Sequence, residues 1–212
     1  TVVELQKNGY DVIIADNLVN SSMDVLDGIE KISGIRPEFE EIDLTDGEVT
    51  RDFFTRHSDI RAVIHFAALK AVGESVNKPL EYYFNNLNSL MNVLTCMREF
   101  KVPNLVFSSS CTVYGQADVL PVTEKTPRHE AESPYGNTKV MSEDIIRDLM
   151  RVEPDMKALA LRYFNPIGAH PTAFIGELPN GVPNNLIPYL TQTAIGIREQ
   201  LSVFGDDYNT PD

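Results

Sequence analysis

The sequence alternates short, continuous apolar segments with longer stretches in which apolar residues recur at helical spacing. The strand-length apolar segments lie at 11–15, 38–42, 62–66, 105–107 and 158–163. Helices are predicted at 22–32, 46–57, 79–100 and from 133 to about 150. Continuously apolar strands separated by helices are typical of βαβ units, in which helices cover both faces of a parallel sheet. The pattern therefore predicts an α/β fold with a doubly wound parallel sheet.

The two ends of the chain depart from this alternation. A helix is predicted over residues 1–8, where Gly9 is placed to end it. After Pro166, glycine, proline and asparagine become dense, with a helix predicted at 186–197 and a strand at 201–204. We therefore expect one domain over residues 1–165 and the start of a smaller second domain over 166–212. Because Thr1 falls inside a predicted helix, we also expect the chain to be a fragment of a longer one.

Composition excludes several functional classes. The 212 residues carry a net charge of −13, and an acidic surface repels phosphate backbones, so we expect no nucleic-acid partner. No apolar run reaches the roughly 18 residues of a membrane span, so we expect no membrane association. Two cysteines and no signal peptide suggest a reducing cytosolic setting. The four histidines show no metal-ligand spacing, and we expect no metal.

Small and polar residues follow the predicted strands at the ends where ligands bind in open α/β sheets. Those positions are Asp16, Asp43, Ala67–Ala68, Ser108–Ser110 and Tyr163–Asn165. Each follows an apolar strand, and the carboxyl ends of parallel strands meet at one edge of a sheet. We therefore expect the functional site at this edge.

Tyr135 and Lys139 are spaced four residues apart at the start of a predicted helix, so they share one helix face. A cation beside the phenol is expected to lower the tyrosine pKa and provide a general base near neutral pH. Ser110, at the end of the preceding strand, would complete a triad suited to hydride chemistry at a carbinol carbon. The alternative is a surface tyrosine and a solvated lysine.

Other strand-end residues suit a dinucleotide. A carboxylate at the position of Asp16 accepts hydrogen bonds from adenosine ribose hydroxyls, and it favours NAD over NADP because it repels a 2′-phosphate. Asp43 suits the adenine edge, with a capping role as its alternative. Lys70 is a local cation or a solvated side chain, and Asn85 is a cofactor contact or an exposed amide. His65 is interpreted as a core histidine.

Several motifs together resemble the extended short-chain dehydrogenase/reductase family. They are Ser108–Ser110 with Tyr114–Gly115, Tyr135-x-x-x-Lys139 and Arg162–Asn165. Three longer stretches are similar to the UDP-hexose 4-epimerases within that family, namely 69–75, 163–171 and 183–189. Ala68 and Cys111 depart from the commonest pattern, where glycine and alanine are usual. The resemblance runs along essentially the whole chain.

The resemblance implies a Rossmann-type NAD-binding domain over 1–165, whose first strand and glycine-rich loop would precede Thr1, and the start of a UDP-sugar-binding domain over 166–212. It implies that UDP-galactose and UDP-glucose are interconverted by transient oxidation at sugar C4, with Tyr135 as base, Lys139 holding the nicotinamide ribose and Ser110 bridging to the sugar oxygen. The NAD contacts that it implies are Asp16, Asn17, Leu18, Asn20, Ser21, Asp43, Leu44, Phe66, Ala67, Ala68, Lys70, Asn85, Ser108, Tyr135, Lys139, Tyr163 and Phe164. The implied UDP-sugar contacts are Lys70, Ser110, Tyr135, Phe164, Asn165, Asn185, Leu186 and Phe204.

Other functions stay open at this point. A sister 4-epimerase acting on UDP-pentoses or UDP-N-acetylhexosamines would share these residues. A dehydratase of the same superfamily is less expected, because the acid–base pair that commonly follows the strand of serines is missing from Ser110–Tyr114. A non-catalytic NAD-binding module would need only the cofactor contacts. The helix from Pro79 and the Tyr135 helix also resemble the pair that forms homodimers in this family.

Overall fold

The computed structural model describes residues 1–177, 179, 181–203 and 205. Its contacts divide the chain into two compact units. Unit 1 comprises Thr1–Val12, Leu18–Pro37 and Ile167–Asp212, and unit 2 comprises Ile13–Asn17 and Glu38–Pro166. These units do not test the predicted domain boundary at residue 165, which stays a prediction.

Unit 2 contains all the strands found in the described residues, and every ladder among them is parallel. One sheet pairs β1 (Ile13–Asp16) with β2 (Glu38–Glu41), and the other has the order β3 (Ala62–His65), β4 (Asn104–Ser110), β5 (Lys157–Tyr163). Helices separate these strands along the chain, so the predicted α/β class with parallel βαβ units is confirmed. The serines predicted to follow β4 are its last three residues.

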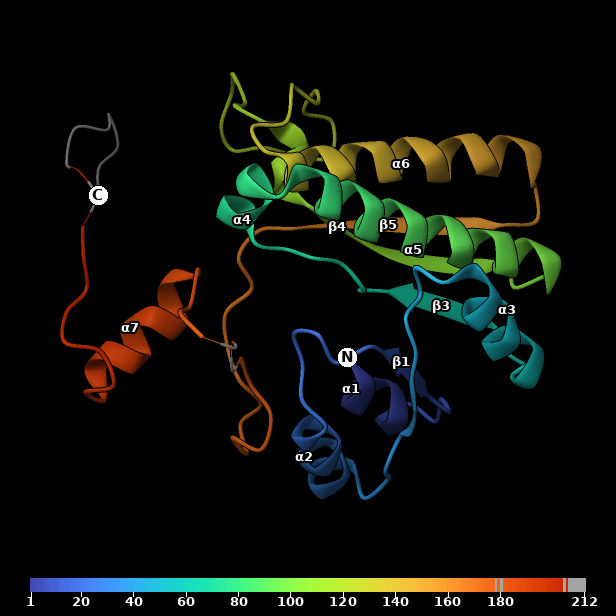
Figure 1. Cartoon of the computed structure of the whole chain (residues 1–212), viewed down its shortest axis with the longest axis horizontal. Coiled ribbons are helices and arrows are strands. Elements are labelled where there is room, and N and C mark those ends of the chain that lie inside the picture. The colour runs from blue at the N-terminus through green and yellow to red at the C-terminus, as the bar shows by residue number, and fades with distance from the viewer. Residues whose placement is uncertain (178, 180, 204, 206–212) are drawn as a thin grey trace. The chain divides into compact units, whose positions relative to one another are not determined.

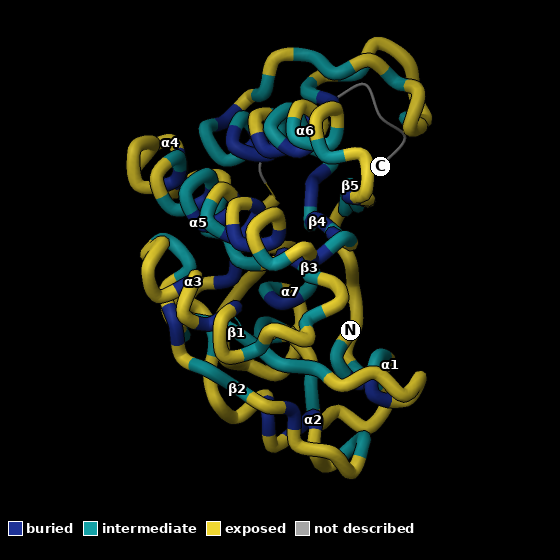
Figure 2. Tube along the Cα trace, turned by 90° about the vertical axis from the view of Figure 1, so that its right-hand side faces the viewer, coloured by how far each residue is buried: buried dark blue, intermediate teal, exposed yellow. Residues whose placement is uncertain are grey.

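The helices of unit 2 are α3 (Gly47–Arg56), α4 (Val72–Asn77), α5 (Pro79–Glu99) and α6 (Pro134–Val152). The long helices α5 and α6 lie side by side along β4 and β5 (Figure 1). Buried positions gather where these helices face the strands (Figure 2), around a core that includes Leu90, Met97, Leu105, Phe107 and Ile146. This core holds α6 against the end of β4.

The helical spacing of the apolar residues in α5 predicts one apolar stripe, formed by Leu80, Tyr83, Leu87, Leu90, Leu94 and Met97. The buried face differs from this stripe over the first turns: Leu80 is 81% exposed, whereas Tyr82, Asn86 and Ser89 are buried. The polar side chains are tolerated because they are hydrogen-bonded: Tyr82 Oη donates to Glu74 Oε2 at 2.8 Å, and Asn86 bonds the backbone of Leu69. Tertiary hydrogen bonds therefore decide which face of α5 is buried.

Unit 1 contains α1 (Val2–Lys7), α2 (Asp24–Ser33) and α7 (Leu186–Ala194). The first two pack together through buried residues that include Val3, Leu26 and Ile29. The strand predicted at 201–204 is wrong over 201–203, which form no ladder, and Phe204 lies outside the described residues. No helix in the described part of the chain is both long and apolar enough to cross a membrane.

Candidate functional site

The start of α6 places the predicted tyrosine and lysine. Ser133 caps the helix, its Oγ accepting the backbone N–H of Gly136 at 3.1 Å, and Pro134 occupies the first helical position. Tyr135 therefore lies in the first turn, and Lys139 follows one turn later on the same face. Both turn inward: Lys139 is buried and Tyr135 is partly buried. The alternative of a surface tyrosine beside a solvated lysine is wrong.

The ammonium group of Lys139 is held against β4. Its Nζ donates a hydrogen bond to the backbone carbonyl of Ser108 at 2.8 Å and lies 5.0 Å from the centre of the Phe107 ring. Burial disfavours the charged form and lowers the pKa of Lys139 to about 8. The side chain is therefore a fixed cation whose charge is easily lost at alkaline pH.

The effect expected at Tyr135 is not observed. Burial raises the pKa of its phenol, and a hydrogen bond with the Ser110 side chain opposes that rise. Lys139 does not reverse it, because its ammonium is itself desolvated and donates to Ser108, and it lies 5.7 Å from the centre of the Tyr135 ring. The expectation that Lys139 sets a low tyrosine pKa is therefore wrong in this structure.

Ser110 joins the tyrosine to the strand end. Its Oγ accepts the backbone N–H of Thr112 at 3.2 Å, which caps the short 3₁₀ helix Cys111–Tyr114. That helix turns the chain away at Gly115, where a Cβ would meet the Glu130 backbone. The structure thus brings Ser110, Tyr135 and Lys139 together at the carboxyl end of β4.

Asn86 on α5 is a site residue that the sequence did not single out, since the prediction named its neighbour Asn85. Its Oδ1 accepts the Leu69 N–H at 2.8 Å, and its Nδ2 donates to the Leu69 carbonyl at 3.0 Å and to Thr138 Oγ1 at 3.1 Å. Asn86 thereby ties the segment after β3 to α6. The sequence feature that could have indicated a buried Asn86 was its spacing of four residues from both Tyr82 and Leu90.

The remaining predicted residues of unit 2 lie at or just beyond strand ends, except Asn85, which lies on α5. Asp16 ends β1, and Asn17 follows it. Asp43 accepts hydrogen bonds from Thr45 N and Oγ1 within a turn, whereas the residue that caps α3 is Asp46. Phe66 and Phe164 are exposed, and the Phe66 and Tyr163 rings are 6.5 Å apart. Four further positions are Leu44, Ala67 and Ala68, which are half-buried, and Lys70, which is exposed. Asn165 is exposed, and Asn85 donates to Asn86 Oδ1 at 3.0 Å.

Among the described residues, five predicted contacts belong to unit 1. Leu18 has a φ of 58°, a left-handed conformation that is unusual for leucine, and Asn20 and Ser21 follow it. Asn185 precedes α7 and donates to Glu177 Oε1 at 3.0 Å, and Leu186 is the exposed first residue of that helix.

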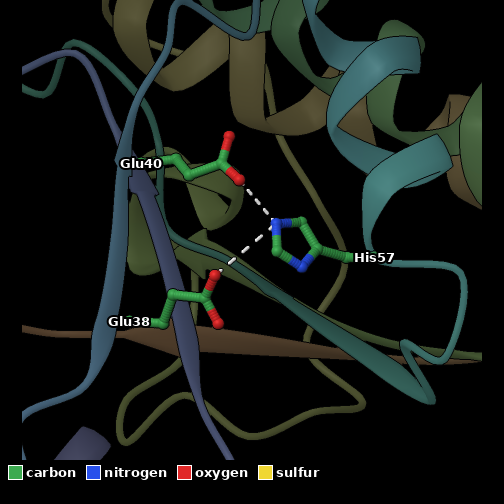
Figure 3. Close-up of side chains that lie close together, drawn as sticks. All are labelled: Glu38, Glu40 and His57. Atoms are coloured by element: carbon green, nitrogen blue, oxygen red, sulfur yellow. Dashed lines mark hydrogen bonds and ion pairs between the residues drawn. The ribbon is translucent and has the colours of Figure 1, made fainter.

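The histidines differ from one another in their surroundings. His65 is buried and stacks on Phe107, and desolvation lowers its pKa to about 3, which confirms the interpretation as a core histidine. His57 lies beside Glu38 and Glu40 (Figure 3), and the side-chain atoms with which these three could bind a metal ion lie within 4.8 Å of one another. The spacing of the histidines in the sequence did not reveal this grouping. Because Arg56 also pairs with Glu40, these residues form an ion-paired cluster.

Known proteins of one kind match this chain along nearly its whole length. The model of the NAD dependent epimerase/dehydratase family matches residues 1–210. The chain is 50% identical over 212 residues to a UDP-glucose 4-epimerase of Dictyostelium discoideum, covering 100% of this chain and 61% of that protein. It thus spans about three-fifths of the length of that relative.

Two solved structures share this fold closely. A UDP-glucose 4-epimerase from Bifidobacterium longum, in complex with NAD+ and UDP, matches with a TM-score of 0.95 and 46% identity, over 99% of this chain and 62% of that one. A UDP-glucose 4-epimerase from Stenotrophomonas maltophila, with bound NAD and formylated UDP-arabinopyranose, matches with a TM-score of 0.94 and 46% identity, over the same shares.

The pKa of Lys139 predicts a pH-dependent stability. The pKa of Lys139 is about 8 in the folded protein and 10.5 ordinarily. Between these two pH values the folded protein binds fewer protons than the unfolded chain, so this residue makes stability rise with pH. Relative to Lys139→Met, we expect the free energy of unfolding of the wild type to rise by about 2 kcal/mol from about pH 7.5 to pH 9.5. Urea unfolding of both full-length proteins measures this. A difference that does not change with pH would contradict a buried, easily deprotonated ammonium.

Proposed function

The chain belongs to the NAD dependent epimerase/dehydratase family, and we propose that the protein it is part of interconverts UDP-galactose and UDP-glucose with NAD as cofactor. The observation that carries this proposal is the grouping of Ser110, Tyr135 and Lys139 at the carboxyl end of β4. The 50% identity to a UDP-glucose 4-epimerase along the whole chain supports the same reaction.

The residues at the strand ends fit a dinucleotide. Ala67 and Ala68 put only methyl groups after β3. Asp16 supplies a carboxylate at the end of β1, and Lys139 supplies an ammonium group at the end of β4. We assign the NAD contacts to Asp16–Leu18, Asn20, Ser21, Asp43, Leu44, Phe66–Ala68, Lys70, Asn85, Ser108, Tyr135, Lys139, Tyr163 and Phe164.

NAD, when bound, supplies the acceptor and later the donor of a hydride at sugar C4. Tyr135 takes the proton of the sugar 4-hydroxyl and afterwards returns it. Ser110, whose side chain opposes the rise of the Tyr135 pKa, links the phenol to the sugar oxygen. Lys139 holds the nicotinamide ribose hydroxyls. The configuration changes because the 4-keto sugar rotates between the two transfers, while contacts to UDP retain it.

The raised pKa of Tyr135 limits how it works as a base. The phenol must lose its proton to act, and burial opposes that loss. The hydrogen bond from Ser110 favours the phenolate and offsets part of the penalty. Substrate and cofactor binding also bring new hydroxyl groups into this edge. Tyr135 therefore depends on its fixed contacts more than on a neighbouring free cation.

The UDP-sugar contacts are assigned to Lys70, Ser110, Tyr135, Phe164, Asn165, Asn185 and Leu186, and to Phe204, which lies outside the described residues. We place the division between an NAD-binding domain and a UDP-sugar-binding domain after residue 165. The two cysteines, both unpaired, suit a cytosolic protein.

We also propose a homodimer formed through α5 and α6. Leu80, Phe84 and Met91 on α5 are exposed, and their spacing of four and seven residues places them along one side of the helix. Met141 adds an exposed apolar side chain on α6. Exposed apolar side chains on two adjacent helices, called the apolar strip, are what a second helix pair would cover.

The proposed reaction predicts a specific assay result. Full-length protein given UDP-galactose without added reductant should form UDP-glucose with no net NADH. Tyr135→Phe should lower kcat at least about 1,000-fold while the content of bound NAD stays the same, because only the proton acceptor is lost. Tyr10→Phe, at an exposed tyrosine, is the matched control and should keep full activity.

Wild-type turnover in Tyr135→Phe would exclude this tyrosine as the base. Conversion of UDP-N-acetylhexosamines or UDP-pentoses, but not of UDP-galactose, would assign the protein to a sister epimerase.

A substitution that introduces a charge tests the proposed dimer. Phe84→Asp places a carboxylate in the apolar strip, where it cannot be solvated within an interface, and should give a monomer in sedimentation velocity. Val119→Asp, at an exposed apolar residue in the loop before α6, should leave the mass unchanged. A monomeric wild type, or a Phe84→Asp variant that stays dimeric, would show that the strip is not the interface.

A further inference from the structure

Glu143 continues the functional face of α6. It follows Lys139 by four residues and Tyr135 by eight, so the three side chains lie on one stripe of the helix. The Glu143 side chain is only 9% exposed although it carries a charge. A buried carboxylate is stable only when it is paired and hydrogen-bonded.

The partners of Glu143 come from the two strands beneath α6. Ser109 Oγ donates to its Oε1 at 2.6 Å. Arg162 donates from Nε to Oε1 at 2.9 Å and from Nη2 to Oε2 at 2.8 Å, a bidentate pair. Ser109 and Arg162 are register partners across β4 and β5. One carboxylate therefore binds two neighbouring strands at matched positions.

The same group reaches the loop that precedes α6. Arg128 Nη1 lies 3.5 Å from Glu143 Oε2, and its Nη2 donates to Asp144 Oδ1 at 2.7 Å. Burial opposes ionisation of Glu143, but Arg162, Ser109 and Arg128 together hold the pKa of its carboxyl below the ordinary value. The carboxylate is thus charged at neutral pH, and both of its oxygens accept hydrogen bonds.

The contacts of the stripe map onto three successive residues of β4. Tyr135 faces Ser110, Lys139 Nζ donates to the Ser108 carbonyl, and Glu143 accepts from Ser109. The Lys139 contact is a single hydrogen bond, whereas Glu143 adds a two-point ion pair with β5. A rotation or slide of α6 that moved Tyr135 would also break the Glu143 contacts, because both side chains lie on one stripe of the helix.

We infer that Glu143 is a positioning residue for the reaction: its carboxylate fixes the rotation and axial position of α6, and thereby the placement of Tyr135 against Ser110. This inference rests on the proposed epimerase function for its kinetic consequence, but the anchoring can be measured without activity. Asp148, on the same helix, offers a contrast, because it is exposed and its ion pair within the described part of the chain is with Arg151 on α6 itself.

The test compares Glu143→Gln with Asp148→Asn in the full-length protein. Glutamine keeps the shape of the side chain but removes the charge that holds Arg162. We expect Glu143→Gln to lower kcat at least about tenfold, while KM for UDP-galactose stays within about threefold and bound NAD is unchanged. Amide hydrogen exchange over residues 133–143 should become faster. Asp148→Asn should leave kcat and the amide exchange over residues 133–143 unchanged.

A second variant separates positioning from the cost of an unpaired buried arginine. Glu143→Gln combined with Arg162→Met removes that stranded charge and should regain stability. If positioning is the cause, kcat stays low in the double variant. Recovery of kcat together with stability would overturn the inference, as would unchanged kcat or unchanged exchange in Glu143→Gln.

The proposed function can fail separately. A wild-type protein without turnover of UDP-galactose would contradict the proposed epimerase reaction. In that case, faster exchange confined to Glu143→Gln would still establish the anchoring, and equal exchange in both variants would refute it.

Discussion

The docking of one face of α6 onto the carboxyl end of β4 is the constraint on which the site depends. Three α6 side chains spaced one turn apart each meet one of three successive serines. The hydrophobic core includes Phe107, the residue directly before the three serines. Packing in this core brings the helix close enough to β4 for these short polar contacts. Packing therefore sets the distance between helix and strand, and the polar contacts set the register.

This arrangement carries an electrostatic cost that shapes the chemistry. Burial lowers the pKa of Lys139 and raises that of Tyr135, so both groups are shifted toward their neutral forms. Such paired shifts are typical of functional sites, where polar groups are held out of water before a ligand arrives. The Glu143–Arg162 pair is the one ion pair among these described α6–strand contacts, and it lies two helical turns from Tyr135.

Much of this could be predicted from the sequence, since strand-length apolar segments and helical spacing specify local structure. Parallel βαβ organisation, the Tyr135–Lys139 face and buried His65 all followed from those patterns. The contacts of Asn86, Ser109 and Glu143 could not be predicted in this way, because they are made with partners 17 to 52 residues away in the chain. The pKa direction at Tyr135 was mispredicted because burial depends on the whole fold. Leu80 was misplaced because tertiary hydrogen bonds, not hydrophobicity, select the buried face of α5.

Transient oxidation at C4 is tested most directly by following the hydrogen itself. Full-length protein is given UDP-galactose deuterated at sugar C4 in ordinary water, and the UDP-glucose formed is examined by NMR. If the hydride leaves and returns within one closed site, deuterium stays at C4 of the product. Loss of deuterium to solvent would indicate removal of a proton from carbon, and it would contradict the roles assigned to Tyr135, Lys139 and Ser110.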